Sequence, residues 1–215
     1  MKKTDTKKIT VIGMFCALAF VAMVSIKIPV VLFLKYEPKD VIITLCGLIY
    51  GPLSSLVVSL IVSFIEMITV SDTGIIGFIM NVLSTVAFSC TASAIYKKTK
   101  TLKGAVIGLI AGVITMTAVM VLWNYIITPL YMATSRTEIA AMLVPIFLPF
   151  NLIKGSINAA LTYILYRPCV EALRRAKLVP TSKNVTSKTN IALIIVAFLV
   201  LISGILMILA YNGII

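Results

Sequence analysis

Long apolar runs separated by short polar stretches dominate the sequence. A helix needs about 20 mostly apolar residues to cross a bilayer. Runs of about this length predict spanning helices at residues 9–26, 77–96, 104–127 and 191–211. A further span follows Pro145 and Pro149 and ends near Tyr166.

The uncharged run 41–65 is interrupted by Gly51-Pro52, which leaves two alternatives. Either 41–50 is a short helix that ends in a turn, or 41–65 is one kinked span. Ten residues rise only about 15 Å, so a short helix would cross part of the bilayer. Both alternatives put most Lys and Arg on the cytoplasmic side, so the positive-inside rule barely separates them. We favour the turn, which places the N-terminus in the cytoplasm and the C-terminus outside.

Composition supports a multi-pass membrane protein. Hydrophobic residues make up 60% and charged residues 12% of the chain, against about 25% charged in soluble domains. This excludes a soluble enzyme and a secreted disulfide scaffold. The formal net charge is +12, and the lysines and arginines lie between apolar runs. There they set the orientation of the chain in the membrane rather than bind nucleic acid. Histidine is absent and no cysteine pair has CxxC spacing, so we expect no metal site.

Polar residues inside the predicted spans gather toward one side of the membrane. Such groups are costly in lipid, so each suggests a functional site. Six such residues, from four predicted helices, lie toward the outer side: Glu66, Asn81, Asn124, Asn151, Lys154 and Asn158. The spacing of Asn151, Lys154 and Asn158 puts them on one helical face, and Gly155 would let a ligand approach the backbone. We expect a flat ligand with hydrogen-bonding edges among nearby aromatic side chains: Phe78, Trp123, Tyr125, Tyr131, Phe147 and Phe150.

Structural roles for these residues remain alternatives. The aromatic side chains also suit a membrane-interface belt. A buried asparagine can serve as a hydrogen bond between helices. Glu66 and Lys154 could form a structural ion pair.

Four motifs carry a resemblance to a known family. They are FLKYEPKD (33–40), SDTG with the following GFIMN (71–81), WNYIITPLY (123–131) and PFNLIKG (149–155). Over about residues 9–175 the chain resembles the riboflavin-binding S components of energy-coupling-factor (ECF) vitamin transporters. The resemblance implies an all-α membrane protein with a six-helix S-component bundle and an outward-facing vitamin site.

The resemblance also implies roles for particular residues. Asn124, Asn151 and Lys154 correspond to flavin contacts, and Tyr36 belongs to a loop that covers the ligand. From their positions alone, Asn81, Glu66 and Asn158 are added to the predicted ligand-binding residues. A small-residue pair at Gly13 and Ala17 stands where the family shows an alanine pair that docks the coupling subunit.

The expected function is therefore capture of a substrate, not catalysis. No Walker A pattern occurs in the chain, so ATP hydrolysis would come from a partner module of one transmembrane coupling subunit and two ATPase subunits. Riboflavin would be bound as substrate, with no cofactor. The alternatives are an S component for another vitamin or for FMN, and a free-standing secondary transporter.

The C-terminal part of the chain departs from the six-helix pattern. We expect a substrate-binding membrane domain at 1–178, a polar linker at 179–190 and an additional transmembrane helix within 191–215. This last span has no charged residue and offers no ligand-binding chemistry.

Overall fold

A computed structural model of the chain describes residues 3–31, 34–71, 73–179, 191–211 and 213. Among these residues, six helical segments are long and apolar enough to cross a membrane. The segments are Thr6–Ser25, Pro52–Thr69, Gly74–Thr99, Leu102–Leu130, Arg136–Arg175 and Ile191–Ala210. The structure thus confirms a helical membrane bundle with an additional C-terminal helix.

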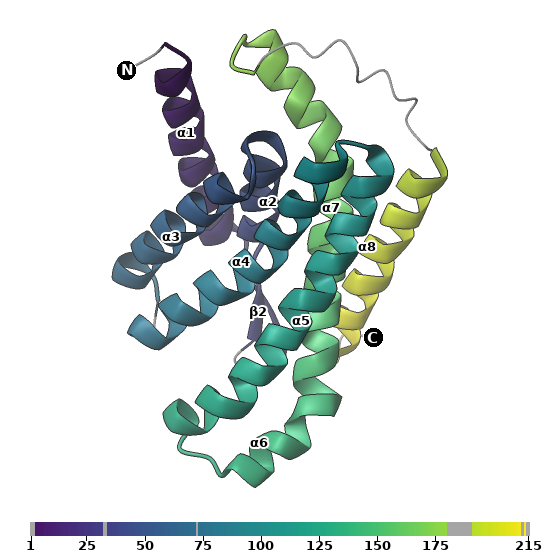
Figure 1. Ribbon diagram of the computed structural model, residues 1–215. Coiled ribbons are helices and arrows are strands. Elements are labelled where there is room, and N and C mark those ends of the chain that lie inside the picture. The colour runs from purple at the N-terminus through teal and green to yellow at the C-terminus, as the bar shows by residue number, and fades with distance from the viewer. Residues whose placement is uncertain (1–2, 32–33, 72, 180–190, 212, 214–215) are drawn as a thin grey trace.

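The described chain forms eight α-helices, one π-helical turn and a short β-hairpin (Figure 1). In chain order these are α1 (Lys3–Ser25), β1 (Ile28–Val31), β2 (Leu34–Tyr36), α2 (Lys39–Tyr50), α3 (Pro52–Thr69), α4 (Gly74–Thr99), α5 (Leu102–Met132), α6 (Arg136–Met142), η1 (Leu143–Phe147), α7 (Leu148–Arg175) and α8 (Ile191–Tyr211). The start of α1, the α2–α3 turn and the end of α7 lie at one end of the bundle. The hairpin, the α3–α4 connection and α6 lie toward the other, which we call the hairpin end.

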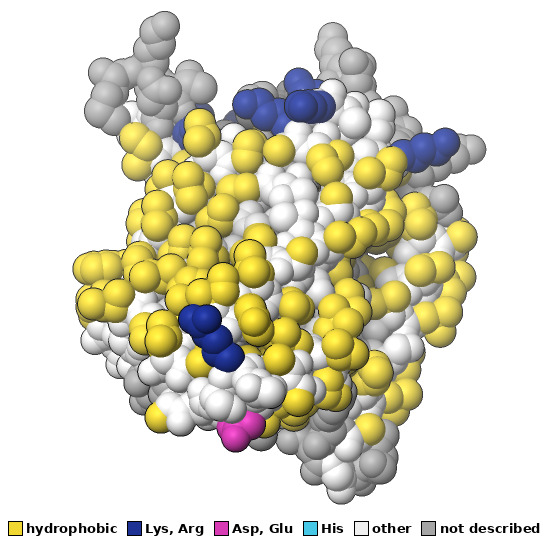
Figure 2. Space-filling model, turned by 60° about the horizontal axis from the view of Figure 1, so that its bottom comes forward, with side chains coloured by type: hydrophobic (Ala, Val, Ile, Leu, Met, Phe, Trp, Pro, Cys, Tyr) yellow, Lys and Arg dark blue, Asp and Glu magenta, His cyan; other side chains and the backbone are white. Residues whose placement is uncertain are grey.

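Exposed cations gather at the first end, which we call the basic end. Figure 2 shows Lys and Arg along its upper edge, above a broad apolar surface. The exposed residues there are Lys7, Lys8, Lys97, Lys98, Lys100, Lys103, Arg167, Arg175 and Lys177. At the hairpin end the described chain exposes Lys35 and Arg136.

The α2–α3 turn resolves the ambiguity at Gly51-Pro52. Gly51 has a φ of 96°, a conformation that side chains with a Cβ rarely adopt. Pro52 follows as the first residue of α3, where a missing N–H costs nothing. The 12 residues of α2 rise about 18 Å, less than a bilayer core of about 30 Å. Two helices joined by a turn, not one kinked span, occupy this region.

Close packing of α4 against α5 depends on two glycines one turn apart. A Cβ at Gly108 would lie 2.6 Å from the carbonyl oxygen of Ala92, and one at Gly112 would lie 2.7 Å from that of Phe88. Neither distance is compatible with a side chain, so the two backbones touch. Small residues at helix interfaces permit this approach in membranes.

Two helices extend beyond their predicted ends, and each contains a proline in the added segment. Helix α5 continues through Pro129 to Met132 rather than stopping at Ile127. Helix α7 passes Pro168 and ends at Arg175, not near Tyr166. A helix that ends inside a bilayer leaves backbone groups unpaired, so a proline is tolerated there more readily than in water.

The segment between α1 and α2 forms a β-hairpin that the sequence did not predict. Its two strands pair antiparallel, with Ile28 opposite Tyr36 and an irregularity between Pro29 and Val31. Buried side chains of the hairpin form one apolar cluster with η1, α7 and α8: Val30, Leu34, Tyr36, Phe147, Phe150, Ile153, Ile157 and Ile208, together with Ile139 of α6.

The α4–α5 contact gives a first test. Gly112→Leu should destabilise the protein by about 1–3 kcal/mol, because the new side chain meets the Phe88 backbone. The measurement is thermal unfolding in detergent. Gly13→Leu is the matched control, since a Cβ at Gly13 meets nothing within 4 Å. Equal stability of the two variants would contradict the packing described here.

Candidate functional site

A cavity of about 570 Å³ lies at the hairpin end. Its walls come from the hairpin, the end of α3, the α3–α4 connection, α4, α5 and α7. Five of the seven residues predicted to bind a ligand line it: Glu66, Asn81, Asn124, Asn151 and Lys154. The structure therefore brings together residues that are up to 88 positions apart (Glu66 to Lys154) in the sequence.

Two buried amides of the cavity wall, one on α5 and one on α7, are held by their own helices. The Nδ2 of Asn124 donates to the carbonyl oxygen of Met120 at 2.7 Å, and that of Asn151 to the carbonyl oxygen of Phe147 at 2.7 Å. Thr128 donates its hydroxyl hydrogen to Oδ1 of Asn124 at 2.9 Å. An amide nitrogen carries two hydrogens, so each side chain keeps a second donor beyond the backbone bond.

Asp40, at the start of α2, lies behind the cavity wall and pairs with Lys154, which lines it. Its Oδ2 lies 3.4 Å from Nζ of Lys154 and accepts a hydrogen bond from Nδ2 of Asn158 at 3.2 Å. Its Oδ1 accepts from the hydroxyl of Thr85 at 2.6 Å. One fully buried carboxylate thus positions side chains from α4 and α7.

The same group of contacts reaches the hairpin. The hydroxyl of Tyr36 donates to Oδ1 of Asn158 at 3.0 Å. Burial, and secondarily the nearby Asp40 carboxylate, raises the pKa of Tyr36, so the phenol keeps the proton that it donates. Tyr36 and Asn158 are not among the residues that line the cavity. They lie beside it and connect the hairpin to Asp40.

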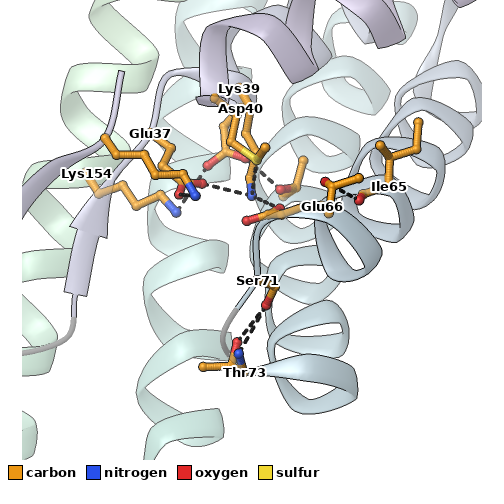
Figure 3. Close-up of polar contacts among 12 residues, drawn as sticks. Glu37, Lys39, Asp40, Ile65, Glu66, Ser71, Thr73 and Lys154 are labelled. Carbon is orange, nitrogen blue, oxygen red and sulfur yellow. Dashed lines mark hydrogen bonds and ion pairs between the residues drawn. The ribbon is translucent and has the colours of Figure 1, made fainter. Parts of the chain in front are cut away.

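A second set of charges centres on Lys39 (Figure 3). Its ammonium group pairs with Glu66 and lies 3.0 Å from Oε2 of Glu37. Oε1 of Glu37 also lies 3.7 Å from Nζ of Lys27. The side chain of Lys39 is only 1% exposed, and buried charges need such partners to offset their lost hydration.

The charges near the cavity balance. The ammonium groups of Lys27, Lys39 and Lys154 face the carboxylates of Glu37, Glu66 and Asp40. Glu66 and Lys154 are therefore both in ion pairs, but not with each other as the structural alternative supposed. Lys35, which is exposed, adds one further cation to the cavity wall.

Two details of the predicted site are wrong. A Cβ at Gly155 would lie 3.0 Å from side-chain atoms of both Met116 and Val113, so Gly155 faces α5 and not a ligand. The expected cluster of aromatic side chains is not found among the described residues at the cavity. Of the described aromatic side chains in that set, only Phe150 lines the cavity. Phe147 is buried in the adjacent apolar cluster, whereas Tyr125 is exposed as an interface residue would be. The side chain of Tyr131 lies outside the described residues.

Burial of Lys39 and Asp40 is not predicted by the sequence pattern. Both missed residues open a short helix that begins inside the bundle. The available signal was a charged Lys-Asp pair directly before an uncharged run.

Outside the cavity, the predicted docking pair lies on an exposed face of α1. Gly13 and Ala17 are both exposed, one turn apart. As for metals, no group of three His, Cys, Asp or Glu side chains in the described part of the chain could hold an ion.

Comparison with known proteins identifies the family. The sequence profile described as "ECF transporter, substrate-specific component" matches residues 7–166. The chain belongs to this family of transporter components. The S component is thus part of a transport system and not an enzyme, and it is a multi-pass membrane protein.

Named relatives agree with this assignment. The S component is 31% identical over 181 residues to "Riboflavin transporter RibU" of Staphylococcus aureus (strain TCH60), covering 80% of this chain and 94% of the relative. It is 31% identical over 186 residues to "Riboflavin transporter FmnP" of Bacillus subtilis (strain 168), covering 80% and 98%. A solved structure, titled "Structure and mechanism of the S component of a bacterial ECF transporter", matches with a TM-score of 0.68 at 31% identity, over 80% of this chain and 99% of that one. Helix α8 begins beyond the segment that the family profile matches.

The Lys39 pairs give a second test. Lys39→Met should destabilise the S component by about 3–5 kcal/mol, because it leaves the buried Glu66 carboxylate unpaired. Glu66→Gln should cost less, since Lys39 keeps Glu37 as a partner. Both are measured by thermal unfolding in detergent. Glu171→Gln, which breaks the exposed Arg167–Glu171 pair, is the matched control and should change stability by at most about 1 kcal/mol. A Lys39→Met protein as stable as this control would refute the structural role of the network.

Proposed function

We propose that this S component captures riboflavin in the hairpin-end cavity for ATP-driven uptake. The observation that carries the proposal is the convergence of Asn124, Asn151 and Lys154 on one cavity. These are the residues for which family resemblance implies flavin contacts. The names of the similar proteins from Staphylococcus aureus, Bacillus subtilis and Streptococcus thermophilus, all riboflavin transporters, support it.

The chemistry of the cavity suits this ligand. Riboflavin is uncharged and carries carbonyl and imide groups on its ring system and hydroxyls on its ribityl chain. Amides both donate and accept, and Lys154 adds a strong donor. A volume of about 570 Å³ lies within the usual 300–1,000 Å³ range of small-molecule sites. The balanced ion pairs leave little net charge to attract the phosphate of FMN, although Lys35 at the wall would be its nearest exposed cation.

Orientation follows from the distribution of cations. The basic end carries most of the exposed Lys and Arg of the described chain, and such residues remain in the cytoplasm. The N-terminus is then cytoplasmic, the hairpin end faces outside, and the end of α8 lies toward the outside. In this orientation the cavity receives riboflavin from the exterior.

Energy for uptake would come from partner chains. We infer a coupling module of one transmembrane subunit and two ATPase subunits, since this sequence has no Walker A motif. The exposed face of α1 at Gly13 and Ala17 offers a surface without bulky side chains at those positions. A helix of the coupling subunit could approach closely there.

Ligand contacts can be tested by titration. Asn124→Ala, Asn151→Ala and Lys154→Ala should each weaken riboflavin binding by about 1–3 kcal/mol, roughly five- to 150-fold. Quenching of riboflavin fluorescence by the purified protein measures this, and the loaded protein should be yellow. FMN should bind more weakly than riboflavin.

Lys98→Ala, at the basic end, is the control for these variants and should bind as wild type. If all three alanine variants bind riboflavin within twofold of wild type, the site lies elsewhere. A colourless protein that leaves riboflavin fluorescence unchanged would reject riboflavin as the ligand.

Docking can be tested separately from binding. Ala17→Trp should leave riboflavin affinity of the isolated protein unchanged but abolish uptake in cells, because the indole blocks close helix approach. Ile195→Trp places the same side chain on the exposed face of α8 and should support normal uptake. Normal uptake by Ala17→Trp would refute the docking face.

A further inference from the structure

Two adjoining cavities follow α7 between α5 and α8, apart from the hairpin-end cavity. The first, of about 230 Å³, lies at the basic end and includes Leu102, Arg167, Arg174 and Ile194 in its walls. The second, of about 310 Å³, continues along the same three helices. Leu109 and Tyr163 line both cavities, so together they form one groove. We call it the α5–α8 groove.

The two halves of the α5–α8 groove differ in chemistry. The half away from the basic end is walled by apolar side chains, among them Val106, Ile110, Val113, Val196 and Val200. The half at the basic end contains the guanidinium groups of Arg167 and Arg174 and the carboxylate of Glu171. Glu171 pairs with Arg167 at 3.0 Å, which leaves the charge of Arg174 without a carboxylate in this half. Its net charge is therefore positive.

Arg174 contributes a buried hydrogen-bond donor to this half of the groove. Its Nε–H is buried and has no hydrogen-bond acceptor among the described residues. A buried donor without an acceptor is costly. An anionic oxygen in the adjoining cavity would satisfy it.

We propose that the α5–α8 groove binds an acidic glycerophospholipid of the leaflet at the basic end. The phosphate lies at Arg167 and Arg174, and one acyl chain occupies the apolar half. An amphipathic groove with cations in one half and apolar walls in the other matches this molecule in charge and in its division into a polar and an apolar part. Basic pockets between transmembrane helices on the cytoplasmic side are recurrent sites for acidic headgroups. Since Ile194 and Val196 belong to α8, the groove depends on the helix that lies outside the family match.

Competition between lipids tests the proposal on the full chain in neutral detergent. Native mass spectrometry with dioleoyl phosphatidylglycerol and dioleoyl phosphatidylcholine should show at least about tenfold tighter retention of phosphatidylglycerol, equivalent to about 1.4 kcal/mol. Phosphatidylglycerol should also raise the thermal unfolding midpoint more than phosphatidylcholine does. Inorganic phosphate should not reproduce the rise, because the apolar half would stay empty.

Two kinds of variant locate the site. The double variant Arg167→Gln/Arg174→Gln should lose the preference for phosphatidylglycerol, whereas Lys97→Gln/Lys98→Gln removes the same charge at the same end and should keep it. Ala159→Trp, which fills the apolar half, should lower retention of both lipids. Riboflavin titration reports whether each variant is folded.

Three results would overturn the proposal. The first is equal retention of the two lipids by the wild type. The second is an unchanged preference in Arg167→Gln/Arg174→Gln. The third is a rise in unfolding midpoint with inorganic phosphate equal to that with phosphatidylglycerol.

Discussion

Burial of charge inside a membrane bundle is the constraint on which the hairpin end depends. Lys39 is 1% exposed and Asp40 is completely buried. Taking an ion out of water costs several kcal/mol unless a partner offsets it. The partners come from different elements: Glu37 from the segment after β2, Glu66 from α3 and Lys154 from α7. The hairpin segment, α3 and α7 therefore each supply a partner that offsets a buried charge of α2.

The contacts of the network divide into those that bind the hairpin and those that join helices. Two contacts tie the hairpin segment to the bundle: the hydrogen bond from Tyr36 to Asn158 and the ion pair between Glu37 and Lys39. The ion pair of Asp40 with Lys154 joins α2 to α7, and its hydrogen bond with Thr85 joins α2 to α4. Movement of the hairpin would break the first group and leave the second intact. The contacts of Asp40 thus join helices alone, whereas the hairpin segment is held by its own few polar contacts.

Hydropathy was sufficient to predict the spans, and intramembrane amides were sufficient to find most of the cavity. Burial of Lys39 and Asp40 was not predictable in the same way, because charged residues beside a loop ordinarily face solvent. The hairpin was not predicted because its strands have only four and three residues. Such short strands do not show an alternation of apolar and polar residues. Gly155 was misassigned because spacing places residues on a face but does not say which neighbour that face meets. In Gly155's case the neighbour is α5.

Helix α8 has no charged side chain, yet its packing is specific. Its buried residues Ala197, Gly204 and Ile208 are spaced seven and four apart, which forms one stripe along the helix. A Cβ at Gly204 would lie 2.6 Å from the side chain of Ile157 in α7. Lipid tails are as apolar as the helix, so association within a bilayer requires close steric fit rather than hydrophobicity alone. A helix that served only as a tether would need no such stripe. Because Ile208 also joins the cluster that contains Tyr36, α8 supports the same hairpin that borders the cavity.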